Sequence, residues 1–185
     1  MRAFAIRAVL LFPGLLGVAA CASLTEPGDG CGTFEGRLSG AASDTVSGCA
    51  LFSMDTTGTL FGMLLTNGGP YDVYPAIKLV GPRRPVTGTT PIFGCSGGGS
   101  ELCGVAFLGS QRFALSGTIV VTESDTLNLK GSITATGTDP DGTVLSISGS
   151  FMAPCRGHRD PFETLDDPPG NARKPTPCKP GTGTG

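Results

Sequence analysis

The sequence predicts an all-β protein: an antiparallel β-sandwich, or a flattened barrel, of about 8–9 short strands. Three observations lead to this fold class. Several segments alternate apolar and polar residues, glycine-rich turns separate them, and no segment shows the helical period of about 3.6 residues. After the last strand the composition changes to Pro, Gly, Asp, Arg and Lys, which predicts a disordered C-terminal tail.

The clearest alternation lies at 33–39, 127–135 and 143–153. A period of two is typical of a strand that buries one face, so these segments are predicted as the first strand and the last two. Further strands with a less regular pattern are predicted at 48–54, 57–66, 76–80, 87–93, 104–108 and 113–122. Turn residues gather between them, as at 67–70 and 139–142.

The two faces of these strands differ in composition. Outward positions are largely Ser and Thr, which suit a pleated surface. Several inward positions are glycine, such as Gly36, Gly131 and Gly149. Because small residues bury little apolar area, at about 25 cal/mol per Å², disulfides are expected to contribute to stability.

The N-terminus predicts export. Arg2 and Arg7 precede an apolar run at 8–20 that is interrupted by Pro13 and Gly14. This run is shorter than the roughly 20 apolar residues of a permanent membrane span, so residues 1–20 are predicted to be a cleaved signal peptide.

The end of that run, Val18-Ala19-Ala20-Cys21, resembles the lipobox of bacterial lipoproteins. The resemblance implies that the thiol of Cys21 carries a diacylglycerol and that Cys21 becomes the mature N-terminus. Lipid would then be the membrane partner of the protein, and Ala22, which is not the aspartate of inner-membrane retention, favours the outer membrane. The alternative is cleavage after Ala22, which releases a secreted or periplasmic protein starting at Ser23.

Composition divides the chain into a signal peptide (1–20), a tether (21–30), a β-sandwich domain (31–155) and a Pro/Gly-rich tail (156–185). A domain of about 125 residues is an ordinary size for one hydrophobic core. The chain carries 13 Lys and Arg against 15 Asp and Glu, and this balance argues against nucleic acid as a partner.

Six cysteines remain when Cys21 is set aside, an even number that predicts three disulfides in an exported chain. Cleavage after Ala22 leaves the same number. Cys95 and Cys103 enclose a flexible segment and are the easiest pair, and Cys178 is expected to join the tail to the domain or to Cys155. A further possibility pairs Cys31 with Cys155, since they bracket the first and last strands, and leaves Cys49 for Cys178.

Chemistry-bearing motifs point away from catalysis, and no cofactor or metal is expected. No CxxC occurs, and the single histidine, His158, lies just past the last strand, which disfavours zinc and a Ser-His-Asp or Cys-His site. Asp139 and Asp141 lack the further ligands of a calcium loop, and a hairpin turn explains them. Arg83 and Arg84 are interpreted as part of a solvated loop.

Two alternatives remain open. Carboxylates that converge only in the fold would make the protein a secreted or anchored hydrolase. Tyr71 and Tyr74, on the loop 67–75, would stack on a sugar ring in a glycan-binding module, although the chain has no tryptophan. A deep pocket with inward acidic groups would favour the hydrolase, and a filled core would favour a binding or structural protein.

Four strand patterns resemble those of an uncharacterised family of Gly/Ser/Thr-rich β-sandwich lipoproteins of Gram-negative bacteria. The matching segments are Ser47-Gly48-Cys49-Ala50-Leu51-Phe52, Phe113 with Ser116-Gly117-Thr118, Gly131-Ser132-Ile133 and Gly149-Ser150-Phe151-Met152-Ala153. The resemblance covers residues 32–153, does not include the cysteines, and implies the fold without an activity. The resulting expectation is a non-enzymatic lipoprotein of the cell envelope, with a binding or structural role toward an envelope glycan or protein.

Overall fold

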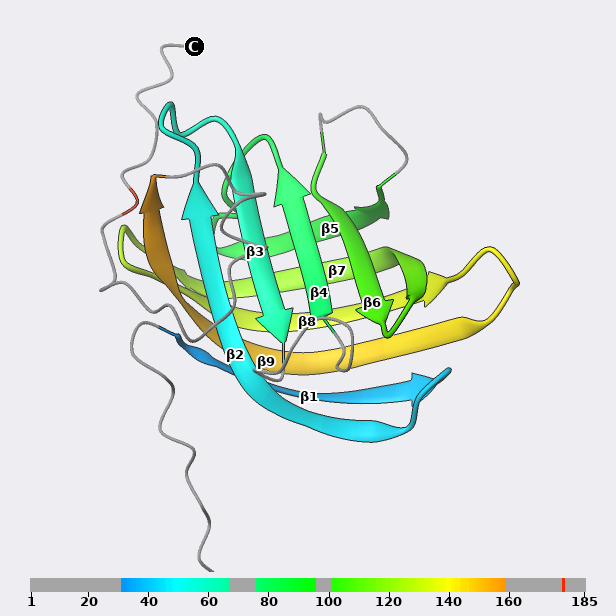
Figure 1. Ribbon diagram of the computed structural model, residues 1–185. Coiled ribbons are helices and arrows are strands. Elements are labelled where there is room, and N and C mark those ends of the chain that lie inside the picture. Colours follow the sequence, from blue (N-terminus) through cyan, green and yellow to red (C-terminus); the bar gives the residue numbers. More distant parts are fainter. Residues whose placement is uncertain (1–30, 67–75, 96–100, 159–177, 179–185) are drawn as a thin grey trace, which may run out of the picture.

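The computed structural model describes residues 31–66, 76–95, 101–158 and 178, and confirms the all-β class. Nine strands form one closed, barrel-like sheet (Figure 1). In chain order they are β1 (Thr33–Gly40), β2 (Asp44–Met54), β3 (Phe61–Thr66), β4 (Ala76–Gly81), β5 (Gly88–Gly94), β6 (Cys103–Leu108), β7 (Gln111–Ser124), β8 (Asn128–Thr138) and β9 (Val144–His158). The described residues contain no helix of the length and apolarity that a membrane span requires.

The barrel is flattened into two layers. Around it the strands follow the order β1-β2-β3-β4-β6-β5-β7-β8-β9, and β9 pairs with β1 to close it. In Figure 1, β2, β3, β4 and β6 run across β5, β7, β8, β9 and β1. The long strands β2 and β7 belong to both layers, because each pairs with a different neighbour along its two halves. Strands that change layers in this way make the corners of a flattened barrel.

Each predicted segment corresponds to one of the nine strands, with shifts at the ends. At 57–66, for example, β3 begins only at Phe61. The Asp55 carboxylate accepts the backbone N–H groups of Thr59 (2.6 Å) and Leu60 (2.9 Å), and this turn takes up the residues before the strand. At the other end of the domain, β9 continues to His158, past the predicted boundary at 155.

The barrel interior is one contiguous apolar core. Strands β7 and β8 alternate buried and exposed residues along most of their length, as the period of two predicts. The second half of β2 and all of β3 are buried on both faces. There the outward residues Leu51, Leu64 and Ala76 form a second apolar cluster with Cys49. The hydroxyls of Ser53 and Thr66 are buried without a hydrogen-bond partner, and the period of two places both on this outer face.

The inward glycines make room for an aromatic ring. Gly36 pairs with Gly149 across β1 and β9, and the Phe34 ring lies against both. A Cβ on Gly36 would lie 2.8 Å from Phe34 Cζ, and one on Gly149 would lie 2.9 Å from Phe34 Cε2. Phe34 is 1% exposed, so the ring occupies the space that these residues leave open.

Three disulfides link Cys31 to Cys49, Cys95 to Cys103 and Cys155 to Cys178. The predicted Cys95–Cys103 pair is confirmed, and Cys178 joins the tail to Cys155, one of the two expected outcomes. The alternative pairs Cys31–Cys155 and Cys49–Cys178 are wrong. Strands β1 and β9 do pair, but Cys155 belongs to the barrel core whereas Cys31 packs against the outer cluster, so the two face opposite sides of the sheet.

Candidate functional site: the tethered end of the barrel

The predicted site residues are largely outside the described part of the chain. Cys21, Tyr71 and Tyr74 lie outside the described residues, as does the side chain of His158. The described residues begin at Cys31, ten positions after Cys21, so the barrel end at which Cys31 lies is the one that joins the predicted tether (21–30). We call this the tethered end: the start of β1, the β4–β5 loop (82–87), the β7–β8 turn (125–127) and the end of β9.

The chain joins the barrel between β2 and β9. Gly32 donates its N–H to the carbonyl oxygen of Ala50 at 2.9 Å, and the Cys31–Cys49 disulfide holds the preceding residue to the same strand. On the other side, a Cβ on Gly32 would lie 1.8 Å from the Met152 carbonyl oxygen and 2.5 Å from Pro154 Cδ. A larger residue would not fit at Gly32, so the point at which the tether leaves the barrel is fixed.

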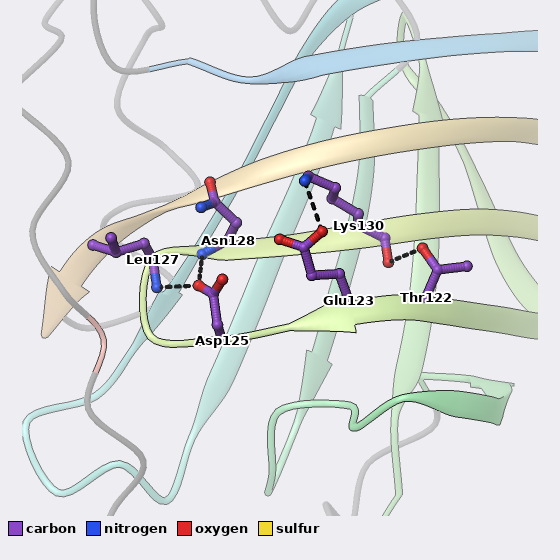
Figure 2. A network of polar contacts seen from close by, with 6 residues as sticks. All are labelled: Thr122, Glu123, Asp125, Leu127, Asn128 and Lys130. Carbon is purple, nitrogen blue, oxygen red and sulfur yellow. Dashed lines mark hydrogen bonds and ion pairs between the residues drawn. The ribbon is translucent and has the colours of Figure 1, made fainter.

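The β7–β8 turn is ordered by one carboxylate. Figure 2 shows Oδ1 of Asp125 accepting the backbone N–H groups of Leu127 and Asn128, both at 2.7 Å. These two hydrogen bonds lower the pKa of Asp125, because they favour its charged form. Next to the turn, Lys130 Nζ forms an ion pair with Glu123 Oε2 at 2.7 Å.

The β4–β5 loop packs onto this turn through Arg84. Its guanidinium donates a hydrogen bond to the main-chain oxygen of Asp125 at 2.5 Å and lies 5.9 Å from the centre of the Phe52 ring. Burial lowers the pKa of Arg84, and the charge of Asp125 opposes that shift. A second link runs from Ser124 Oγ to the Pro85 carbonyl oxygen at 3.1 Å. Two segments about 40 residues apart thus form one surface.

The tail cysteine supports the same turn from the barrel side. The backbone N–H of Cys178 donates to the Thr126 carbonyl oxygen at 2.7 Å, and that of Cys155 donates to the Leu127 carbonyl oxygen at 2.7 Å. Cys155 and Cys178 are both fully buried in the core, and their disulfide joins the two. The turn is therefore held by backbone hydrogen bonds on one side and by Arg84 on the other.

Side chains with exposed tips project from this held surface. Val86 is 72% exposed, the largest value among the exposed large hydrophobic residues of the described chain, and Leu127 is 44% exposed. Arg83, beside Arg84, is exposed. The loop prediction for Arg83 and Arg84 is confirmed, but Arg84 has defined partners within the barrel end rather than a purely solvated side chain.

The carboxylates of the described residues lie on turns and outward positions. Asp139 is the one buried carboxylate among them, and its Oδ1 accepts the N–H groups of Asp141 (3.0 Å) and Thr143 (2.8 Å) in the β8–β9 hairpin. The hairpin prediction for 139–142 is confirmed. Within the described ranges, no three His, Cys, Asp or Glu side chains are grouped to hold a metal ion.

Comparison with family models, with curated proteins and with solved structures finds no match for this chain.

The link between Arg84 and Asp125 was not predictable from the sequence. The sequence shows a turn at Asp125 and two arginines in a loop, but nothing local relates one to the other.

Proposed function

We propose that the protein is a non-enzymatic lipoprotein of the cell envelope, anchored by lipid on Cys21. The observation that carries the proposal is the use of cysteine. The three disulfides involve the six cysteines other than Cys21. Cys21 directly follows a short apolar run with two small residues before it, where a lipoprotein carries its acylated residue.

Acylation also suits the redox chemistry of an exported chain. A seventh, free thiol next to three disulfides would be able to attack them and exchange partners. A thioether to diacylglycerol removes that nucleophile. Each buried methylene contributes about 0.8 kcal/mol to membrane binding, so several acyl chains together hold the protein firmly.

A binding or structural role is supported by the character of the interior. The inward positions of the described strands form a contiguous apolar core, and the buried Asp139 is engaged by its own turn. A general acid or base needs a carboxyl group that is free to reach a substrate. We therefore assign the barrel to display of its loops and ends in the envelope, with the outer membrane as its location.

The test is the intact mass of the protein extracted from membranes, compared with a Cys21→Ser variant and a Ser23→Ala control. We expect an acylated N-terminus at Cys21 in the wild type and in Ser23→Ala, and we expect Cys21→Ser to leave the membrane fraction. After reduction, the tryptic peptide that ends at Arg37 locates the acyl mass. A mature N-terminus at Ser23 without acyl mass overturns the proposal.

A further inference from the structure

We infer that the tethered end of the barrel rests on an anionic lipid surface, with Val86 and Leu127 in the headgroup region and Arg83 facing the lipid phosphates. This inference rests on the proposed lipid anchor and adds an orientation to it. Three observations at this end support it: where the tether joins, which apolar tips are exposed, and how the charges are paired.

The tether restricts which end reaches the membrane. Cys31 lies ten positions after Cys21, and fully extended this segment spans at most about 35 Å. Register places the start of β1 beside the end of β9, because Thr33 pairs with Met152 and Met152 pairs with Lys130 near the β7–β8 turn. At the left of Figure 1 the start of β1, this turn and the end of β9 lie together.

The opposite end is less accessible to the anchor. It carries the β8–β9 hairpin, and β8 alone has 11 residues, or about 36 Å at the usual rise of a strand. To bring that end to the membrane, the tether would have to run fully extended along the barrel. Full extension of a chain segment costs conformational entropy, so this arrangement is unfavourable.

The exposed apolar tips match a lipid interface. Val86 lies on the β4–β5 loop and Leu127 on the β7–β8 turn, the two segments that Arg84 joins. Because these segments are already held together, their contact with a membrane costs little further conformational entropy. Single exposed hydrophobic side chains are common and need no partner. Here two of them share one rigid barrel end with the tether, and that combination favours an interface.

Among the described residues of this end, Arg83 is an exposed cation in a position to face the lipid. Lys130 is paired with Glu123, and the Asp125 carboxylate is occupied by two backbone N–H groups. The side chain of Arg83 is on the same loop as the exposed Val86. Without residues 1–20, which hold Arg2 and Arg7, the chain has 11 Lys and Arg against 15 Asp and Glu, a net charge of −4, so its attraction to anionic lipid is local and weak. The acyl chains hold the protein, and these side chains set which end faces the bilayer.

The chain has no tryptophan, so single-tryptophan variants report orientation directly. The acylated full-length variants Val86→Trp and Leu127→Trp are compared with Val144→Trp, whose residue is 46% exposed at the opposite end. Each is placed in phosphatidylglycerol vesicles with brominated acyl chains, which quench tryptophan near the lipid. We expect at least twofold stronger quenching for Val86→Trp and Leu127→Trp than for Val144→Trp. Equal quenching, or stronger quenching of Val144→Trp, overturns the inference.

Two measurements on the same samples separate the possible failures. The intact mass reports acylation: its absence rejects the proposed anchor, whereas an acylated protein with equal quenching rejects only the orientation. Arg83→Glu in the Val86→Trp background tests the charge, and we expect it to reduce quenching in phosphatidylglycerol but not in phosphatidylcholine vesicles. Unchanged quenching in both lipids contradicts the role of Arg83. Matching urea midpoints confirm that the variants are folded.

Discussion

Arg84 donates a hydrogen bond from its guanidinium to the main-chain oxygen of Asp125, 41 residues further along the chain. The same guanidinium lies over the Phe52 ring of the barrel core. One side chain thus connects a loop, a hairpin turn and the core at the barrel end where the tether joins.

Replacing Arg84 should therefore loosen this end. Arg84→Ala is expected to lower the free energy of unfolding by about 1–2 kcal/mol, because it removes a charge-assisted hydrogen bond and a cation–π contact from a half-buried position. Arg83→Ala, at the exposed neighbouring residue, should change it by less than about 0.5 kcal/mol. Urea denaturation measures both. Equal effects of the two substitutions would contradict the role of Arg84.

Asp125 should make the stability of the fold depend on pH in the acidic range. Its hydrogen bonds from Leu127 and Asn128 hold its pKa below the ordinary value of 3.8, so the folded state favours the carboxylate. This contribution is fully present above pH 3.8 and is lost as the pH falls through the lowered pKa. Asp125→Asn keeps an acceptor for the turn but does not titrate. The urea midpoint of the variant should fall less below pH 4 than that of the wild type. Plots of urea midpoint against pH that run parallel for the two proteins would refute this.

The loss of unfolding free energy on removal of a single disulfide should increase with the length of chain that the disulfide closes. The cysteines of Cys155–Cys178 are 23 residues apart, and those of Cys95–Cys103 are 8 apart. The chain-entropy relation gives about 3.4 and about 2.5 kcal/mol for the two. The Cys155/Cys178 double alanine variant should lose more, since its sulfurs also leave a cavity in the core. Chemical denaturation of the double alanine variants gives the order, and the reverse order would argue against it.

Gly149 should not tolerate a methyl group. A Cβ there would lie 2.6 Å from the Glu35 carbonyl oxygen and close to the Phe34 ring, so Gly149→Ala requires β1 and β9 to move apart. We expect a loss of about 1–3 kcal/mol, as for other overpacked cores. Ser150→Ala, on the exposed neighbouring residue, is the control and should be near neutral. A thermal or urea midpoint for Gly149→Ala equal to that of the control would contradict this packing.

At three places the structure shows something that the sequence pattern did not predict. Phe61 to Leu65 is an apolar run that was predicted as a strand, but its pattern did not show that β3 is buried on both faces. From the composition of the tail, only Cys178 was expected to connect to the domain, through a disulfide. The structure places that cysteine in the core, bonded to Cys155. Cys31 and Cys155 were considered as partners because their strands pair, and the facing of their side chains excludes this.

The amino-acid sequence by itself determined the strands and the turns, because alternation and turn residues are local properties. A short apolar run is local too, and from it the sequence predicts an N-terminal export signal. Only the tertiary structure decided that β6 lies between β4 and β5, which cysteines pair, and that Arg84 meets Asp125. These contacts join residues far apart in the chain. They depend on the register of each strand pair and on closure of the barrel, and a shift of one residue reverses the face on which every side chain lies.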